Sequence, residues 1–169
     1  MEEVSLQEML AAREHRSALQ TRLLQQYKKS LISFTLNIPG PVKVPDGVPQ
    51  AFATGCRRIE TLLKDRLVLV QHMETIKEKT GYEAFYCIDA NPEFIKTLMV
   101  TLEDQDRLGR LFDIDVIRPD GSKVSREELG RPSRTCLLCK EPAHACSRSR
   151  RHSVAELTAE IGHILKDLY

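Results

Sequence analysis

The same helix-start signal occurs near both ends of this sequence. A serine precedes a glutamate by three residues at Ser5–Glu8 and again at Ser153–Glu156. Such a pair forms a capping box, in which each side chain binds the other residue's backbone amide. Apolar residues recur at helical spacing after the first pair. We therefore expect one helix over residues 5–28 and another from about 153 to 168, with the rest of the fold between them.

The segments between these helices are mainly strand-like. β-Branched and aromatic residues, or period-two alternation, predict strands at 30–37, 82–88, 97–102 and 111–117. A turn at Pro119–Gly121 then leads to residues 122–124, which predicts a β-hairpin. A second helix is expected from about Val48 to Leu63, after a loop with four prolines, while residues 67–73 fit either period. These elements predict an α+β fold with a largely antiparallel sheet flanked by helices, a class that includes nucleotidyltransferase-like folds.

The length of the chain, 169 residues, suits one domain with one hydrophobic core. We expect a single domain over residues 1–169, with the N-terminal helix in 1–29 and the C-terminal helix in 153–169. No apolar run approaches the ~20 residues that a membrane-spanning helix needs. The acidic N-terminal segment is unlike a secretory signal. A cytoplasmic protein without membrane contact is therefore expected.

Two aspartates, Asp113 and Asp115, interrupt an otherwise apolar strand segment. Alternate residues of a strand share a face, so both carboxylates are expected to point away from Phe112, Ile114 and Val116. Like charges side by side repel, and a divalent cation relieves that repulsion. Carboxylates suit Mg²⁺, so the pair is a candidate magnesium and catalytic site for phosphoryl or nucleotidyl transfer. The alternative is an amphipathic strand with a solvated acidic face.

Arginines flank this acidic strand along the sequence. Residues 107–152 contain eleven Lys and Arg against six Asp and Glu, whereas the rest of the chain is net acidic. A basic segment indicates an anionic ligand, although a solvated basic face has the same charge pattern. Guanidinium groups are well shaped to bind phosphate oxygens. The candidate phosphate-binding residues are Arg110, Arg126 and Arg134.

Three of the five cysteines lie within eleven residues, and a histidine follows them. The spacing is C-x2-C-x6-C-x5-H, formed by Cys136, Cys139, Cys146 and His152. Three thiolates and one imidazole complete the tetrahedral shell of a structural zinc ion, with His144 as an alternative fourth ligand. The other interpretation is that these cysteines are small buried apolar residues near a turn. Cys56 and Cys87 lie in apolar patterns and are expected in the core.

A short basic cluster, Arg148–His152, precedes the final helix. The chain has nine aromatic residues and no tryptophan, which is too few for the base-stacking surfaces of nucleic-acid-binding proteins. A phosphate-rich cofactor or an acidic protein partner fits the cluster better, and a solvated turn remains open. No nucleic-acid partner is expected.

Several of these motifs follow one another in the order of a known family. They are GRLFDIDV at 109–116, PDG at 119–121, SR at 125–126, RTCLLC at 134–139, then Cys146, Arg148 and His152. The chain closely resembles the holo-citrate lyase synthase family, also called apo-citrate lyase phosphoribosyl-dephospho-CoA transferase. The resemblance runs from about residue 30 to the C-terminus and is strongest over 107–157. One departure is Thr135, where the family can have a second arginine.

The resemblance implies a specific group transfer. The 2′-(5″-phosphoribosyl)-3′-dephospho-CoA group would pass from triphosphoribosyl-dephospho-CoA to a serine of the acyl-carrier (gamma) subunit of citrate lyase, releasing pyrophosphate. Residue chemistry then suggests the roles. Asp113 and Asp115 would hold Mg²⁺ on the triphosphate, and one of them would help to deprotonate the serine. The three arginines, Arg110, Arg126 and Arg134, would hold phosphate oxygens and the departing pyrophosphate.

Two other functions fit parts of the pattern. A general nucleotidyltransferase acting on small phosphate substrates would use the same acids and arginines without a carrier protein. A zinc-dependent interaction module would use the cysteine cluster, and its acidic strand would only be solvated. Carrier loading by an Asp113→Ala variant distinguishes the module from the enzymes, because only the module has no need of this carboxylate.

Overall fold

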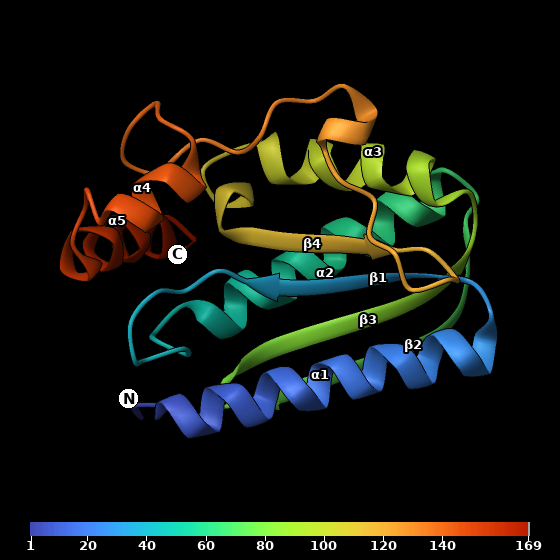
Figure 1. Cartoon of the computed structure of the whole chain (residues 1–169), viewed down its shortest axis with the longest axis horizontal. Coiled ribbons are helices and arrows are strands. Elements are labelled where there is room, and N and C mark those ends of the chain that lie inside the picture. Colours follow the sequence, from blue (N-terminus) through green and yellow to red (C-terminus); the bar gives the residue numbers. More distant parts are fainter. Residues whose placement is uncertain (169) are drawn as a thin grey trace.

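The protein, described here from a computed structural model, packs helices on both faces of a four-stranded sheet (Figure 1). The structure describes residues 1–168, so Tyr169, the last residue of the expected C-terminal helix, lies outside the described residues. In chain order the elements are α1 (Leu6–Tyr27), β1 (Ser30–Leu36), α2 (Val48–Asp65), β2 (Leu69–Glu78), β3 (Gly81–Asp89), α3 (Pro92–Asp104), β4 (Phe112–Ile117), α4 (Ala143–Ser149) and α5 (Val154–Lys166).

Both predicted capping boxes are present. The Ser5 side chain accepts from the Glu8 amide while the Glu8 carboxylate accepts from the Ser5 amide, and Ser153 and Glu156 repeat the arrangement. These bonds satisfy amide groups that a helix otherwise leaves unpaired in its first turn. The two terminal helices therefore begin where the sequence predicts.

The sheet has the strand order β2-β3-β1-β4, and every pair is antiparallel. The α+β class with an antiparallel sheet is thus confirmed, as are the strands predicted at 30–37, 82–88 and 111–117. The helix α1 crosses one face of the sheet, and α2 and α3 cover the other face (Figure 1).

The two faces of the sheet are packed unequally. The face toward α2 and α3 carries the larger core, which includes the fully buried Phe34, Tyr86 and Phe112. The face toward α1 has a small apolar cluster that includes Leu23 and Phe85. Because α1 packs on only part of its face, the remaining strand positions there are free to carry polar residues.

The prediction of a strand at 97–102 is wrong, because these residues belong to α3. Asn91 caps this helix through its side chain, and Pro92 occupies the first turn, where proline costs no hydrogen bond. Buried Met99 and Leu102 lie on one helical face. A six-residue apolar run does not distinguish the helical period from the strand period. The residues that mark the helix start, Asn91 and Pro92, lie before this run.

Two smaller differences concern turns. Most of the ambiguous segment 67–73 belongs to β2, and Leu67, with a left-handed φ of 58°, lies in the turn between α2 and β2. The predicted hairpin after β4 is reduced to a turn and a single bridge between Ile117 and Lys123, so 122–124 is not a full strand. Within residues 1–168, none of the helices is both long enough and apolar enough to cross a bilayer.

Candidate functional site

The predicted acidic pair lies on one face of β4. Asp113 and Asp115 share the strand face of Ile117, which packs in the cluster under α1, while Ile114 between them is fully buried on the other side. Asp115 Oδ2 is 3.2 Å from Lys123 Nζ. Among residues 1–168, no group donates a hydrogen bond to the Asp113 carboxylate. The pair is therefore only partly compensated by protein groups.

Its surroundings raise the pKa of Asp113. The main cause is loss of water, because protein surrounds the carboxyl group on several sides although the residue is exposed overall. The negative charges of Asp115 and Glu103 raise this pKa further, while Arg134 and Lys96 lower it. Two mutually repelling carboxylates with one open side match the oxygen donor set and the vacant positions that Mg²⁺ requires.

Buried side chains of α3 hold the peptide between the two aspartates. β4 is an edge strand, so the outward backbone groups of Ile114 have no strand partner. Glu103 Oε2 accepts from the Ile114 amide at 2.9 Å, and Lys96 Nζ donates to the Ile114 carbonyl at 2.8 Å. Neither residue was predicted to belong to the site from the sequence. Their seven-residue spacing on one helical face was the available signal, and the predicted strand at 97–102 hid it.

The predicted phosphate-binding arginines already bind protein groups. Arg110 Nη2 donates to the Thr135 carbonyl at 2.6 Å. Arg134 donates to the Phe112 carbonyl at 2.6 Å and to the Arg110 carbonyl at 2.9 Å. These bonds tie segment 134–136 to the start of β4, and they bring Arg110 and Arg134 together.

Arg126 is placed differently from these two arginines. Its Nη2 lies 2.8 Å from Glu103 Oε1 and 3.1 Å from Asp104 Oδ1, and its side chain is only 10% exposed. Burial alone would lower the pKa of this guanidinium, and the two carboxylates raise it. Arg126 thus balances the charge of Glu103, and Glu103 accepts a hydrogen bond from the Ile114 amide of β4.

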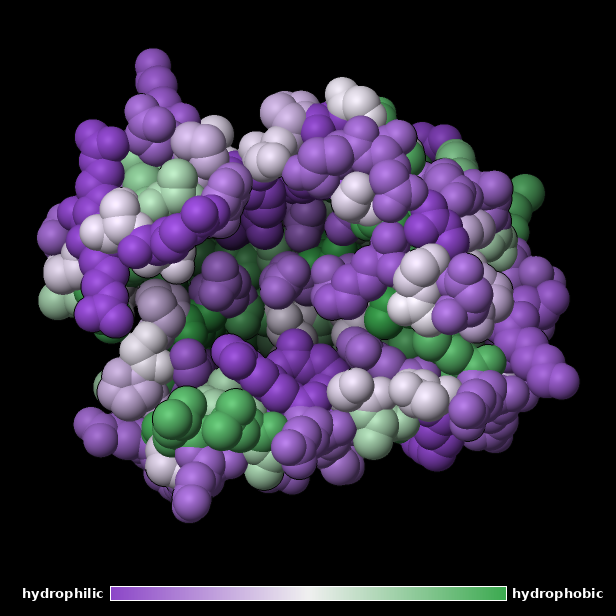
Figure 2. Space-filling view, viewed as in Figure 1, coloured by the Kyte–Doolittle hydropathy of each residue, from purple (hydrophilic) through white to green (hydrophobic). Residues whose placement is uncertain are grey.

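On the α1 side, Asp115 lines a cavity of about 440 Å³. The other wall includes Arg13 and Arg16 of α1, and Lys123 borders it from the turn after β4. Arg16 Nε is 2.8 Å from Glu83 on β3. The space-filling view shows this face of the molecule hollowed between α1 and the chain above the sheet (Figure 2). Asp115 thus borders a space with cationic side chains in its walls, which suits a polyphosphate.

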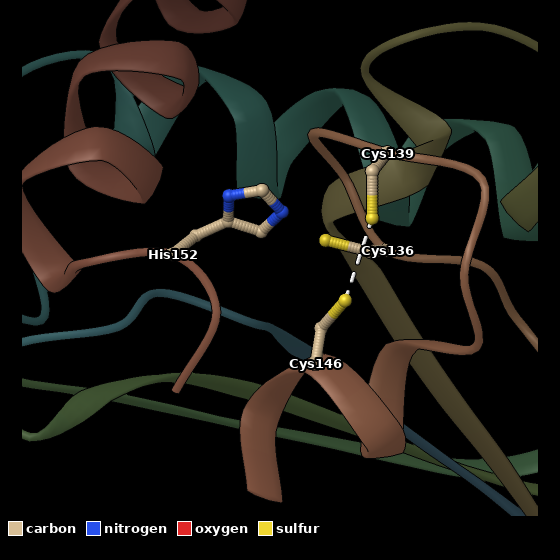
Figure 3. A group of neighbouring side chains, drawn as sticks. All are labelled: Cys136, Cys139, Cys146 and His152. Carbon is tan, nitrogen blue, oxygen red and sulfur yellow. Dashed lines mark hydrogen bonds between the residues drawn. The ribbon is translucent and has the colours of Figure 1, made fainter. Parts of the chain in front are cut away.

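The predicted cysteine and histidine ligands form one compact group (Figure 3). The ligand atoms of Cys136, Cys139, Cys146 and His152 all lie within 4.8 Å of one another, and Cys139 and Cys146 Sγ are 3.4 Å apart. Thiolates around a tetrahedral zinc lie about 3.7 Å apart. All five cysteines are free thiols, and Cys56 and Cys87 are buried elsewhere, as predicted.

His152 points into this group of thiols (Figure 3). Its Nε2 is buried and has no hydrogen-bond partner within the described chain, while its Nδ1 is 3.7 Å from Glu156 Oε2. A metal-binding histidine commonly faces a carboxylate with its other nitrogen. The alternative ligand, His144, is exposed on α4 and does not belong to the group. The four residues can therefore hold a metal ion with four ligands.

A larger cavity, about 610 Å³, separates the start of β4 from α4 and α5. We call it the α5 cavity. Leu157 and Ile161 of α5 line one side, and Arg110 and Arg134 line another. The metal-ligand group forms part of the wall, through Cys136, Cys146 and His152.

Comparison with known proteins gives one consistent family. The family model described as apo-citrate lyase phosphoribosyl-dephospho-CoA transferase matches residues 4–168. A probable enzyme of that name from Streptococcus pyogenes serotype M18 is 37% identical over 99% of this chain and 88% of its own length. One from Vibrio cholerae serotype O1 is 39% identical over 97% of this chain and 93% of its own. One from Citrobacter koseri is 34% identical, with coverages of 97% and 90%.

Proposed function

Since this chain belongs to the apo-citrate lyase phosphoribosyl-dephospho-CoA transferase family and is a transferase, we propose that it loads the prosthetic group of citrate lyase. The donor is triphosphoribosyl-dephospho-CoA, and the acceptor is a serine of the acyl-carrier (gamma) subunit. The reaction takes place in the cytoplasm. The observation that carries the proposal is the same-face acidic pair on β4, beside a space with cationic walls.

The reaction is a substitution at phosphorus. The serine Oγ attacks the phosphorus nearest the ribose, and a new P–O bond forms. The bond from that phosphorus to the bridging oxygen breaks, so pyrophosphate leaves with the electron pair. The serine proton passes to a base, and one of the two aspartates helps to receive it. The product is a phosphodiester between the carrier and the phosphoribosyl group.

Asp113 and Asp115 are the proposed ligands of Mg²⁺. When bound, the ion supplies positive charge that neutralises the triphosphate oxygens. Asp113 suits this role because its carboxylate has no hydrogen-bond donor within residues 1–168 and lies beside a second acid. The bonds from Lys96 and Glu103 to Ile114 keep the strand between the two aspartates in place.

Arg110 and Arg134 are the proposed phosphate-binding residues. Both lie at the start of β4, and each guanidinium has more N–H groups than its carbonyl contacts occupy. A phosphate role for Arg126 stays a prediction, because its guanidinium already pairs with Glu103 and Asp104.

We also propose that the Cys/His group holds a structural zinc ion. Four protein ligands leave no position for a substrate, which is the arrangement of structural zinc sites. The buried Nε2 of His152 gains the partner that it lacks among residues 1–168. The ion would join segment 136–139 to α4 and to the start of α5, and so hold one wall of the α5 cavity.

The transfer is tested by weighing the carrier. The full chain is mixed with apo-carrier subunit, triphosphoribosyl-dephospho-CoA and Mg²⁺, and the intact carrier is measured by mass spectrometry. We expect the carrier to gain one phosphoribosyl-dephospho-CoA group with one pyrophosphate released, and EDTA to stop the reaction. An unchanged carrier mass, with the precursor consumed on a small acceptor, would favour a general nucleotidyltransferase.

The zinc proposal is tested by elemental analysis. We expect one zinc per wild-type chain and a loss of zinc in Cys139→Ser, because that variant lacks one of four ligands. Cys87→Ser is the matched control, since Cys87 is a buried thiol outside the group. Wild-type protein without stoichiometric zinc would end the proposal.

A further inference from the structure

The α5 cavity has an apolar side that the phosphate chemistry does not use. Leu157 and Ile161 of α5 line it together with Leu111 and Leu137 from the opposite side. Small-molecule sites are typically concave and largely apolar, with a few polar groups that fix orientation, and have volumes of about 300–1,000 Å³. The α5 cavity, at about 610 Å³, falls in this range.

The polar side chains of Arg150 and Asn37 also line the cavity. Arg150, just after α4, is exposed, and within the described chain it has no acidic partner. Asn37, at the end of β1, lines the cavity as well, and its side-chain amide has no hydrogen-bond partner among residues 1–168. A cation and an amide beside an apolar wall match a ligand with a flat base and a phosphate.

The cavity reaches the segment that leads into the acidic strand. Arg110 and Leu111 line it, and Asp113 follows two residues later on β4. In the proposed donor, the phosphoribosyl group is attached at the 2′ position of the adenosine. Adenosine is therefore the part of dephospho-CoA nearest the reacting phosphorus, whereas the pantetheine arm lies beyond the 5′ phosphates.

We propose that the α5 cavity binds the adenine nucleotide part of the donor, with adenine against Leu157 and Ile161 and the 5′ phosphates at Arg150. This inference rests on the proposed function for the identity of the donor. It gives Arg150 a binding role that neither the acidic strand nor the other arginines supply, and it places the pantetheine arm outside the cavity.

The experiment measures binding of 3′-dephospho-CoA and of ADP to the full zinc-loaded chain by isothermal titration calorimetry, without carrier. Leu157→Trp fills the cavity from a half-buried position, and we expect it to weaken both ligands by at least about tenfold. Arg150→Ala removes a charge-assisted phosphate contact, and we expect a loss of about tenfold.

Arg151→Ala is the matched control, because Arg151 is also exposed and is adjacent in the chain but does not line the cavity. We expect its affinity to equal that of the wild type. Since Arg150 is a surface residue, Arg150→Ala remains informative even where Leu157→Trp lowers stability. Wild-type affinity in Arg150→Ala and in a folded Leu157→Trp would overturn the inference, as would absence of binding by the wild-type chain.

The outcome is separable from that of the proposed function. If the wild-type chain loads the carrier while the cavity variants bind dephospho-CoA normally, the transfer stands and the cavity assignment fails. If the cavity variants lose dephospho-CoA binding while the carrier is never loaded, the nucleotide site stands and the transfer fails.

Discussion

The acidic pair on β4 and the Cys/His group border different cavities and are built in different ways: Asp115 lines the cavity on the α1 side, and Cys136, Cys146 and His152 line the α5 cavity. Asp113 and Asp115 belong to a sheet strand, and one side of the pair opens to solvent. Three of the Cys/His ligands come from loops and the fourth, Cys146, from α4, and they face one another. With metal ions bound as proposed, the first arrangement would leave room for a substrate at the metal, and the second would not.

The two groups of residues therefore suit different roles, one in catalysis and the other in stabilising the structure. Open metal positions are a property of catalytic sites, whereas closed four-ligand shells are a property of structural ones. The rigidity of the acidic pair comes from Lys96 and Glu103 behind the strand. On the proposed zinc assignment, the ion would order the Cys/His segment by joining its four ligands.

The largest expected effect is at the open site. Asp113→Asn keeps the shape of the side chain but removes its charge, and we expect carrier loading to slow on the order of 10³-fold. Asp120→Asn is the control, because Asp120 is an exposed turn residue whose carboxylate, within residues 1–168, accepts hydrogen bonds only from Ser122. Single-turnover loading rates measure both. A rate within twofold of the wild type in Asp113→Asn would leave the pair with no catalytic role.

The next effect concerns the support behind β4. Arg126→Ala leaves the buried Glu103 without its nearest cation, so we expect the free energy of unfolding to fall by about 3 kcal/mol. Urea denaturation measures the loss, with the exposed Arg131→Ala as control. A stable Arg126→Ala protein with weakened pyrophosphate binding would instead restore the phosphate role that the sequence predicts.

A smaller effect is expected at the closed site. Glu156→Gln retains an oxygen for the Ser153 cap but removes the charge facing His152, so we expect zinc affinity to fall about tenfold. Competition with a chromogenic chelator measures this affinity, and carrier loading at saturating zinc should not change. If loading fell at full zinc occupancy, the contrast between chemistry and support would be broken.

The smallest effect is a gain in stability. Folding raises the pKa of Asp113 above 3.8, so between pH 3.8 and the raised value the folded state binds more protons than the unfolded state, and stability falls as pH rises through this range. Ionised Asp113 therefore destabilises the folded protein at neutral pH, and Asp113→Asn should have a higher Tm there. Calorimetry should show this difference shrinking as pH falls toward 3.8, and Mg²⁺ should reduce it at neutral pH by stabilising the wild type.

Local signals in the sequence account for much of this structure. The capping boxes at Ser5 and Ser153 and the alternation around Asp113 depend on neighbouring residues, so they are readable along the chain. The Cys/His spacing likewise brought its four ligands into one prediction, which the fold assembles.

The wrong and missing predictions concern residues whose structure depends on segments distant in the sequence. The run at 97–102 fits a strand in isolation and becomes helical through Asn91 and its packing on the sheet. Arg126 pairs with a helix carboxylate, and Arg134 donates to the carbonyl of Phe112 on β4; sequence spacing reveals neither contact. Lys96 was overlooked for the same reason, since its partner is a backbone carbonyl of another element.

Binding of Mn²⁺ tests the role of the acidic pair without relying on turnover. Manganese suits the same carboxylate ligands as Mg²⁺, and electron paramagnetic resonance reports how much of it remains free. With EDTA-treated, zinc-reloaded protein and the triphosphoribosyl donor present, wild-type protein should remove one Mn²⁺ per chain from solution beyond that bound by the donor alone. Asp113→Asn should remove none. Equal Mn²⁺ uptake by the two proteins would contradict the assignment of the β4 aspartates as metal ligands.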